Sequence, residues 1–300
     1  MKTSTDTPDK THPASTVILV REEDQELQVY LLKRSSGSGF FPGNYVFPGG
    51  TLEEDDWKLE FWKDRLDLSG EEIDKTFGLG LELDDLIAYG VAAIRETLEE
   101  AGVFLARQKS PVQGSHEMTG LRPPAEAMLI DWFRNKVLNE NWTLSFSRLF
   151  PWSHWITPVA MSKRFDTRFF IALMPEGQVC VPDDRETVHG LWVSPLKGLQ
   201  ENIRGEIPLS PPTLITLHEL LPYNKLADLT NTLRPDAWAE PQLPVLFKLE
   251  KGAVIVEPWD PQYGKEIEIE PKGLEQKVAA IGAPFSRLWL HKGIWRPLKF

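Results

Sequence analysis

Short apolar runs separated by charged or glycine-rich turns dominate the first fifty positions, a pattern typical of β-strands. Residues 16–20 and 27–32 are two such runs, and they flank the charged stretch 22–26, which predicts a β-hairpin. A third run, residues 45–47, stops at the turn-forming segment 48–50. We therefore expect the amino-terminal part of the chain to contribute strands to a sheet.

The clearest helical pattern covers residues 84–101. Two aspartates stand at its start, where carboxylates complement the helix dipole, and Gly102 follows it as a typical C-cap. Apolar side chains recur every three or four positions along it, which predicts one packed face: Ile87, Val91, Ile94, Leu98 and Ala101.

The rest of the chain alternates irregularly between strand and helix patterns, which indicates an α+β fold. Residues 51–83 combine acidic pairs with short helical patterns and predict an inserted helical segment. Further helices are expected at residues 125–138 and 212–221, and further strands at 152–157, 168–173, 189–193, 253–256 and 267–269.

These patterns divide the chain into three parts. Residues 1–15 are polar and predict a flexible tail. Residues 16–234 form the main domain, which carries the helical insertion at 51–83. Residues 235–300 form a β-containing extension whose role stays open between a dimerisation arm, a lid and a wall of the substrate site.

Composition narrows the function classes. The 300 residues are 41% hydrophobic, enough for a core, and their formal net charge is −11. That charge disfavours binding to nucleic acid or to an anionic membrane, because both need a cationic surface. The single cysteine, Cys180, excludes an internal disulfide. Without an apolar leader or an apolar run of about 18 residues, we expect a cytoplasmic protein with no membrane partner.

The candidate chemistry lies at the end of the predicted helix. Glu96, Glu99 and Glu100 stand at i, i+3 and i+4, so their carboxylates share one face and repel one another. A hard cation such as Mg²⁺ would relieve that repulsion and also bind substrate phosphates. A solvated acidic face is the plain alternative. The tight turn Phe47-Pro48-Gly49-Gly50 favours a site, since glycines let the backbone approach a ligand.

Together, this turn and residues 92–103 resemble the Nudix box. In that family a glycine, five residues and a glutamate are followed, after seven residues, by Arg-Glu-apolar-x-Glu-Glu-x-Gly-apolar. Thr97 stands at a usually apolar position. The second half of the box is matched at Arg95, Glu96, Glu99, Glu100, Gly102 and Val103.

An insertion of roughly thirty residues separates the two halves of the box. The position of the early glutamate stays open, because Asp56 has the right offset from Gly50 and Ile87 has the right offset from Arg95. With an insertion at this place, the chain resembles the branch that includes the RP2-type peroxisomal coenzyme A diphosphatase. Further similarity to that branch lies at residues 32–35, 41–50, 155–158 and 164–170. The resemblance implies an α/β/α sandwich with a mixed β-sheet.

The resemblance also implies residue roles. Glu96, Glu99 and Glu100, with the carbonyl of Gly49, would bind one to three Mg²⁺ or Mn²⁺ ions, and Arg95 would orient a metal-binding glutamate. Glu99, Glu100 and Arg95 would thus be catalytic.

The general base and the phosphate ligands come from less specific signals. Glu186, in an acidic loop before a predicted strand, is the candidate general base, with His189 as the alternative. Arg34, Lys33 and Arg168 are candidates to bind substrate phosphates, and a solvated surface role is the alternative for each.

The implied activity is Mg²⁺-dependent hydrolysis of a diphosphate bond in a nucleotide-linked small molecule. The leading substrate is coenzyme A or an acyl derivative. Diphosphatase activity on ADP-ribose, a dinucleotide or a nucleotide sugar is one alternative, and a non-catalytic nucleotide-binding module of the same fold is another. A homodimer remains open.

Overall fold

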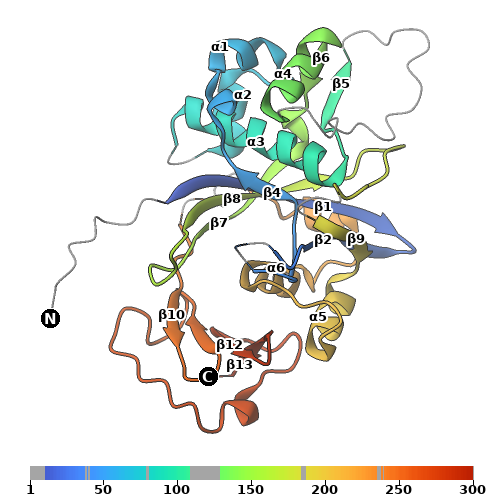
Figure 1. Ribbon diagram of the computed structural model, residues 1–300. Helices are drawn as coiled ribbons and strands as arrows, with labels where there is room; N and C mark the ends of the chain where they lie inside the picture. The colour runs from blue at the N-terminus through green and yellow to red at the C-terminus, as the bar shows by residue number, and fades with distance from the viewer. Residues whose placement is uncertain are drawn as a thin grey trace, which may run out of the picture.

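A mixed sheet with helices on both faces forms the centre of the molecule (Figure 1). The computed structural model describes residues 11–37, 39, 41–78, 81–108, 129–183, 187–234, 238 and 240–299. Within these ranges, no helix has the length and apolar character needed to cross a membrane.

The central sheet has seven strands in the order β3-β2-β1-β8-β7, with β4 paired to β1 and β9 paired to β2. The pairing of β1 with β8 is parallel and the other pairings are antiparallel, so the sheet is mixed, as predicted. Its strands are β1 (His12–Glu23), β2 (Glu26–Arg34), β3 (Tyr45–Val46), β4 (Gly49–Thr51), β7 (Leu149–Ile156), β8 (Phe165–Leu173) and β9 (Thr187–Val193).

The first strand begins earlier than the sequence predicted. His12 to Ser15 pair with β8, although the flexible tail was expected to extend to residue 15. The buried Ser15 side chain donates a hydrogen bond to the Tyr89 carbonyl at 2.7 Å. The polar composition of this segment concealed a strand that is held by neighbours distant in sequence.

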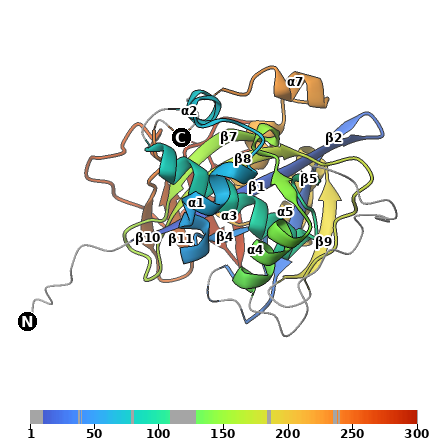
Figure 2. The same cartoon turned by 90° about the horizontal axis from the view of Figure 1, so that it is seen from above.

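One face of the sheet is covered by the helical layer built around α3 (Leu83–Ala101), which lies across the sheet in Figure 2. This helix confirms the predicted 84–101 pattern, and Gly102 ends it in the left-handed conformation, with φ of 68°. The inserted segment is helical, as predicted. The surrounding elements are η1 (Glu54–Trp57), α1 (Leu59–Trp62), η2 (Lys63–Arg65), α2 (Gly70–Phe77), β5 (Ala106–Gln108), α4 (Leu129–Asn139), β6 (Trp142–Leu144) and η3 (Phe146–Arg148).

The opposite face carries α5 (Pro195–Arg204), α6 (Pro211–Leu220), α7 (Leu226–Thr230) and the carboxy-terminal sheet. That sheet has the order β10-β11-β12-β13. It belongs to the same hydrophobic cluster as the central sheet, because Ile255 and Trp295 pack into the group that contains Ile18 and Leu214. Its elements are β10 (Val245–Lys248), β11 (Ala253–Val256), η5 (Leu274–Lys277), β12 (Arg287–His291) and β13 (Ile294–Leu298).

The strand predicted at residues 267–269 is wrong. This segment has no strand structure, and Ile267 and Ile269 instead pack, partly buried, against the core of the carboxy-terminal sheet. The alternation of apolar residues at 267–269 arises because these side chains contact a sheet. The segment itself is not a strand, since none of the described strands pairs with it.

A turn after β11 places two acidic residues in different environments. Asp260 accepts hydrogen bonds from Arg287 at 2.7 and 3.0 Å and from Ser286 at 2.6 Å, and these contacts hold its pKa down at about 2. Glu257 is 1% exposed and neither of its carboxylate oxygens has a partner among the described residues. Burial, and secondarily the charge of Glu219, raise the pKa of Glu257 to about 8.

Replacing Gly90 by alanine is expected to destabilise the fold. A Cβ there would overlap the ring of Phe146, which is fully buried. Overpacking of this kind costs about 1–3 kcal/mol and exceeds the gain of up to about 1 kcal/mol in helix propensity. Urea denaturation should show a lower midpoint for Gly90→Ala, whereas Gly37→Ala, where no atom approaches a Cβ, should match the unchanged protein. Equal midpoints for all three proteins would contradict the close contact.

Removing the ionisable group of Glu257 should change stability in a pH-dependent way. Because the folded-state pKa of about 8 lies above the ordinary value of 4.5, the folded protein retains a proton that the unfolded chain loses. Stability therefore falls as pH rises through this interval. The Tm advantage of Glu257→Gln over the unchanged protein should be smallest near about pH 5 and largest near about pH 9. A Tm difference that does not vary with pH would oppose this assignment.

Candidate active site

The acidic end of α3 is brought against the strand β4. Glu100 accepts a hydrogen bond from the Gly49 amide at 2.9 Å. Gly50 lies so close to the Glu96 carboxylate that any Cβ at this position would overlap it. Gly50 therefore lets the backbone approach Glu96, as the sequence suggested for this turn, whereas a Cβ at Gly49 would overlap the backbone of β1 at Ser15 and Thr16.

Arg95 organises the carboxylates around it. Its side chain is 2% exposed. Its Nη1 group donates to Glu96 at 2.8 Å and to Glu99 at 3.1 Å, and its Nε and Nη2 groups donate to the two oxygens of Asp56 at 3.0 and 2.8 Å. Nη2 also donates to the Thr51 carbonyl at 3.0 Å. Charge-assisted bonds of this geometry fix the direction of each carboxylate.

This network distinguishes the two residues that the sequence offered for the early glutamate position of the box, Asp56 and Ile87. Asp56, from η1, pairs with Arg95, whereas Ile87 is buried in the hydrophobic core under α3. The structure thus brings Asp56 to the site and removes Ile87 from it. Asp56 acts through Arg95, since both of its carboxylate oxygens receive hydrogen bonds from the guanidinium.

Burial changes the proton affinity of the acidic cluster. It raises the pKa of Glu99 to about 8, against the opposing attraction of Arg95, and it raises the pKa of Glu96 as well. The pKa of Glu53 is also raised by burial. Glu53 lines the same cavity and was missed in the sequence; the acidic run that follows Gly50 was the available signal.

The donor chemistry of this cluster fits a divalent metal ion. Glu99 Oε1 and Glu53 Oε2 are buried carboxylate oxygens that lack a partner among the described residues, and hard cations prefer oxygen ligands. In the described part of the chain, however, no three acidic or histidine side chains converge on one point. Arg95 lies between Glu96 and Glu99, so these two carboxylates would have to turn to share a cation.

The cluster forms one end of a cavity of about 1110 Å³ between the central sheet, α6 and the carboxy-terminal sheet. Alternate residues of two strands supply its floor, namely Ala14 and Thr16 of β1 and Phe165, Thr167 and Phe169 of β8. Apolar and aromatic side chains line the end away from the acidic cluster of α3: Trp155, Leu246, Ala253, Ile255, Leu290 and Trp295. Most of this second group belongs to the extension, whose contribution the sequence did not resolve.

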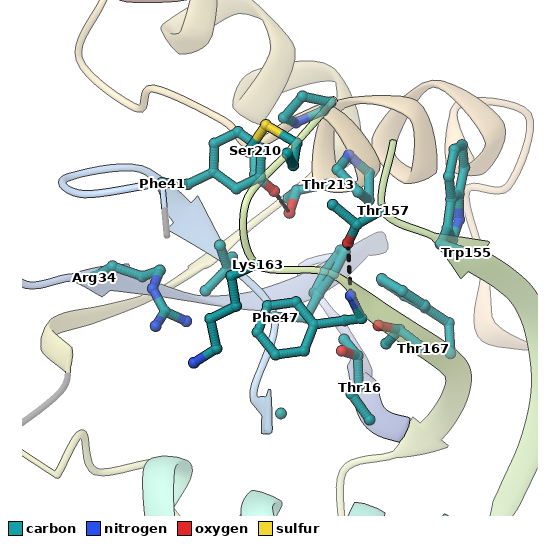
Figure 3. A pocket seen from close by; sticks show the side chains of 18 of the residues that line it. Thr16, Arg34, Phe41, Phe47, Trp155, Thr157, Lys163, Thr167, Ser210 and Thr213 are labelled. Atoms are coloured by element: carbon teal, nitrogen blue, oxygen red, sulfur yellow. Dashed lines mark hydrogen bonds between the residues drawn. The ribbon is translucent and has the colours of Figure 1, made fainter. Parts of the chain in front are cut away.

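Three cationic side chains of the described residues line the cavity: Arg34, Lys163 and, from β10, Lys248. Figure 3 shows Arg34 and Lys163 extending from different elements toward the same part of it, beside Phe47. Arg34 was predicted as a phosphate ligand, whereas Lys163 was missed because a single lysine in a turn carries no sequence signal.

Two other predicted phosphate ligands do not line the cavity. Arg168 is buried on the opposite face of β8, where its guanidinium lies over the rings of Tyr89 and Trp238. Side chains alternate across a strand, so the face that brings Thr167 into the cavity turns Arg168 away from it. Lys33 lies over the ring of Tyr45 instead.

The two candidates for the general base have different outcomes. Glu186 lies outside the described residues. His189 is exposed on β9, where it lies opposite Lys33 and contacts the edge of Tyr45, and it does not line the cavity.

Replacing Gly50 by alanine should damage the site and leave the fold intact. The three atoms nearest to the added Cβ all belong to the Glu96 carboxylate, the end of a flexible side chain that can move aside. Mg²⁺ affinity measured by calorimetry should fall by roughly tenfold or more, as for a displaced ligand group, while Tm stays near that of the unchanged protein. Full Mg²⁺ affinity in Gly50→Ala would show that the position of Glu96 does not matter. The matched control, Gly37→Ala, should bind Mg²⁺ normally.

Comparison with known proteins agrees with this geometry. Residues 10–220 match the family model described as the NUDT19 Nudix domain. An acyl-coenzyme A diphosphatase NUDT19 from Xenopus laevis is 27% identical over 305 residues, covering 89% of this chain and 79% of the relative. The Homo sapiens protein of the same name is 28% identical over 271 residues, covering 79% of this chain and 72% of the relative.

A solved structure supports the fold. The crystal structure of a NUDIX hydrolase from Alicyclobacillus acidocaldarius superposes with a TM-score of 0.54, at 22% identity, and covers 75% of this chain and 97% of that one. The α+β Nudix sandwich expected from the sequence is confirmed. Because the family model spans most of the chain and includes both the Pro-Gly-Gly turn and the acidic helix end, this protein belongs to the NUDT19 Nudix family and is a Nudix hydrolase.

Proposed function

We propose that this protein hydrolyses the diphosphate bond of coenzyme A or an acyl-coenzyme A, in a reaction that requires Mg²⁺ or Mn²⁺. The observation that carries the proposal is a single cavity with an acidic, arginine-organised end and a long apolar end. A diphosphate that carries a nucleotide on one side and an extended organic arm on the other matches these two environments. The names of the relatives from Xenopus laevis and Homo sapiens give independent support.

The residues at the acidic end would have two roles, binding the metal ion and orienting its ligands. Glu96, Glu99 and Glu100, with the Gly49 carbonyl, would hold the divalent ion that members of this family generally use. When bound, such an ion neutralises phosphate charge and lowers the pKa of a bound water. Arg95 orients Glu96 and Glu99 and takes its own orientation from Asp56.

The remaining residues bind and enclose the substrate. Arg34 and Lys163 contribute positive charge for phosphate oxygens at the part of the cavity beside Phe47. The aromatic and aliphatic wall from the carboxy-terminal sheet excludes water from the organic arm and so strengthens the electrostatic contacts at the phosphates. Glu186 stays the sequence-based candidate for the general base.

Diphosphatase activity on ADP-ribose, a dinucleotide or a nucleotide sugar is the alternative. ADP-ribose and the dinucleotides share the adenine base with coenzyme A, but all of these substrates lack its extended pantetheine arm. A Mg²⁺-dependent screen of coenzyme A, acetyl-coenzyme A, ADP-ribose, NADH and a sugar nucleotide, with products identified by mass spectrometry, separates the two. Coenzyme A compounds should give adenosine 3',5'-bisphosphate with the highest kcat/KM.

Loss of one acidic ligand should nearly abolish turnover. Glu99→Gln or Glu100→Gln removes a charge that holds the metal ion, so kcat should fall by roughly two to four orders of magnitude, as for other single catalytic groups. Circular dichroism should show an unchanged fold. Glu60→Gln, an exposed acid on the insertion, is the matched control and should retain full activity. Normal turnover in Glu99→Gln and Glu100→Gln would remove this helix end from the mechanism.

A further inference from the structure

The end of the cavity opposite the acidic helix contains one buried carboxyl group that the proposed chemistry does not use. Glu257 lines the cavity directly after β11, and its side chain is 1% exposed. Neither of its oxygens has a hydrogen-bond partner among the described residues. A buried polar group without a partner is costly, so its position in a ligand cavity suggests that a ligand supplies the partner.

The backbone around Glu257 is fixed on both sides. Its amide donates to the Ser286 carbonyl at 2.9 Å, and its carbonyl accepts from the Asp260 amide at 2.9 Å. Asp260, three residues further on, is fully paired by Arg287 and Ser286. The same turn thus contains a carboxylate that stabilises the fold and a second carboxyl group that is held in place without any such role.

The protonation state of Glu257 defines what it can bind. With burial raising its pKa to about 8, the neutral acid predominates at pH 7. A neutral carboxyl group offers one O–H donor beside one acceptor oxygen. Ile255, Trp155 and Trp295 line the same cavity as Glu257, together with one cation of the same sheet, Lys248. A planar, nitrogen-containing group with an N–H donor and an acceptor atom fits both features.

We infer that Glu257 is a specificity-determining residue that hydrogen-bonds an N–H-bearing group on the organic part of the substrate, inside a subsite built by the carboxy-terminal extension. This inference rests on the proposed function for the identity of the substrate. In coenzyme A such groups occur in two places, at the amino edge of the adenine base and at the amides of the pantetheine arm. Glu257 lies beyond residues 10–220, the part that matches the family model.

The two halves of the substrate can be tested separately as the two products of the proposed reaction. Calorimetry at pH 7 with Mg²⁺ measures Kd for adenosine 3',5'-bisphosphate, which has the base, and for 4'-phosphopantetheine, which has the amides. The proteins are the unchanged chain, Glu257→Gln and Glu257→Leu. Glutamine keeps a donor and an acceptor, whereas leucine keeps only the volume. Glu275→Gln, an exposed acid of the same extension, is the matched control.

For one of the two products, Glu257→Leu should raise Kd by about 10- to 100-fold, the effect expected for losing hydrogen bonds to a buried group. Glu257→Gln should remain within about threefold of the unchanged protein, and Glu275→Gln should not change Kd. The product that responds identifies the group that Glu257 contacts. Leucine buries no polar atom here, so Tm should not fall and the loss can be attributed to the contact.

Three results would overturn the inference: no change in either Kd with Glu257→Leu, equal loss with Glu257→Gln and Glu257→Leu, or no binding of either product to the unchanged protein. Failure of the proposed function has a different signature. In that case no coenzyme A compound is hydrolysed, while the Kd pattern of the variants still reports whether Glu257 makes the contact.

Discussion

The buried guanidinium of Arg95 is the interaction on which the arrangement of this site depends. It lies among three carboxylates, Asp56, Glu96 and Glu99, each within hydrogen-bond distance. Three acids in a site with little water would otherwise repel one another and take up protons. One arginine reduces that repulsion, and its planar geometry fixes the directions of the acids at the same time. It also ties the helical insertion to α3, since Asp56 belongs to the inserted segment.

The packing around Arg95 explains why the two halves of the Nudix box can be far apart in sequence and still form one site. The strand β4 pairs with β1 and carries Gly49 and Gly50, while α3 packs over the same part of the sheet. The insertion runs between them as short helices packed on α3, so it lengthens the connection without separating its ends. The sheet therefore holds the turn and the helix end in contact.

The cavity lies on the face of the central sheet that carries α6 and the carboxy-terminal sheet. Strands β1 and β8 supply a floor, and the carboxy-terminal sheet supplies an apolar wall that shares a hydrophobic cluster with α6. A shallow groove at the acidic cluster would hold only a diphosphate. The extension enlarges the cavity beyond the acidic cluster and places Glu257 in its lining. In the proposed function, catalysis and selectivity would belong to opposite ends of one cavity, and segments far apart in the chain would contribute them.

The sequence by itself determined the features that depend on local periodicity and backbone freedom. The helix at 84–101, the acidic face at its end, the glycine turn and the helical character of the insertion all follow from spacing and composition within a few residues. Tertiary structure decided the rest, because strand alternation does not say which face of a sheet holds a cavity and because contacts between distant segments leave no local pattern. Arg168, a candidate phosphate ligand from the sequence, therefore lies on the face of β8 that turns away from the cavity. Asp56 and Ile87 could not be distinguished before packing placed one beside Arg95 and the other in the core. Glu257 had no signal at all, because an isolated glutamate becomes chemically distinctive only when the folded chain removes it from water.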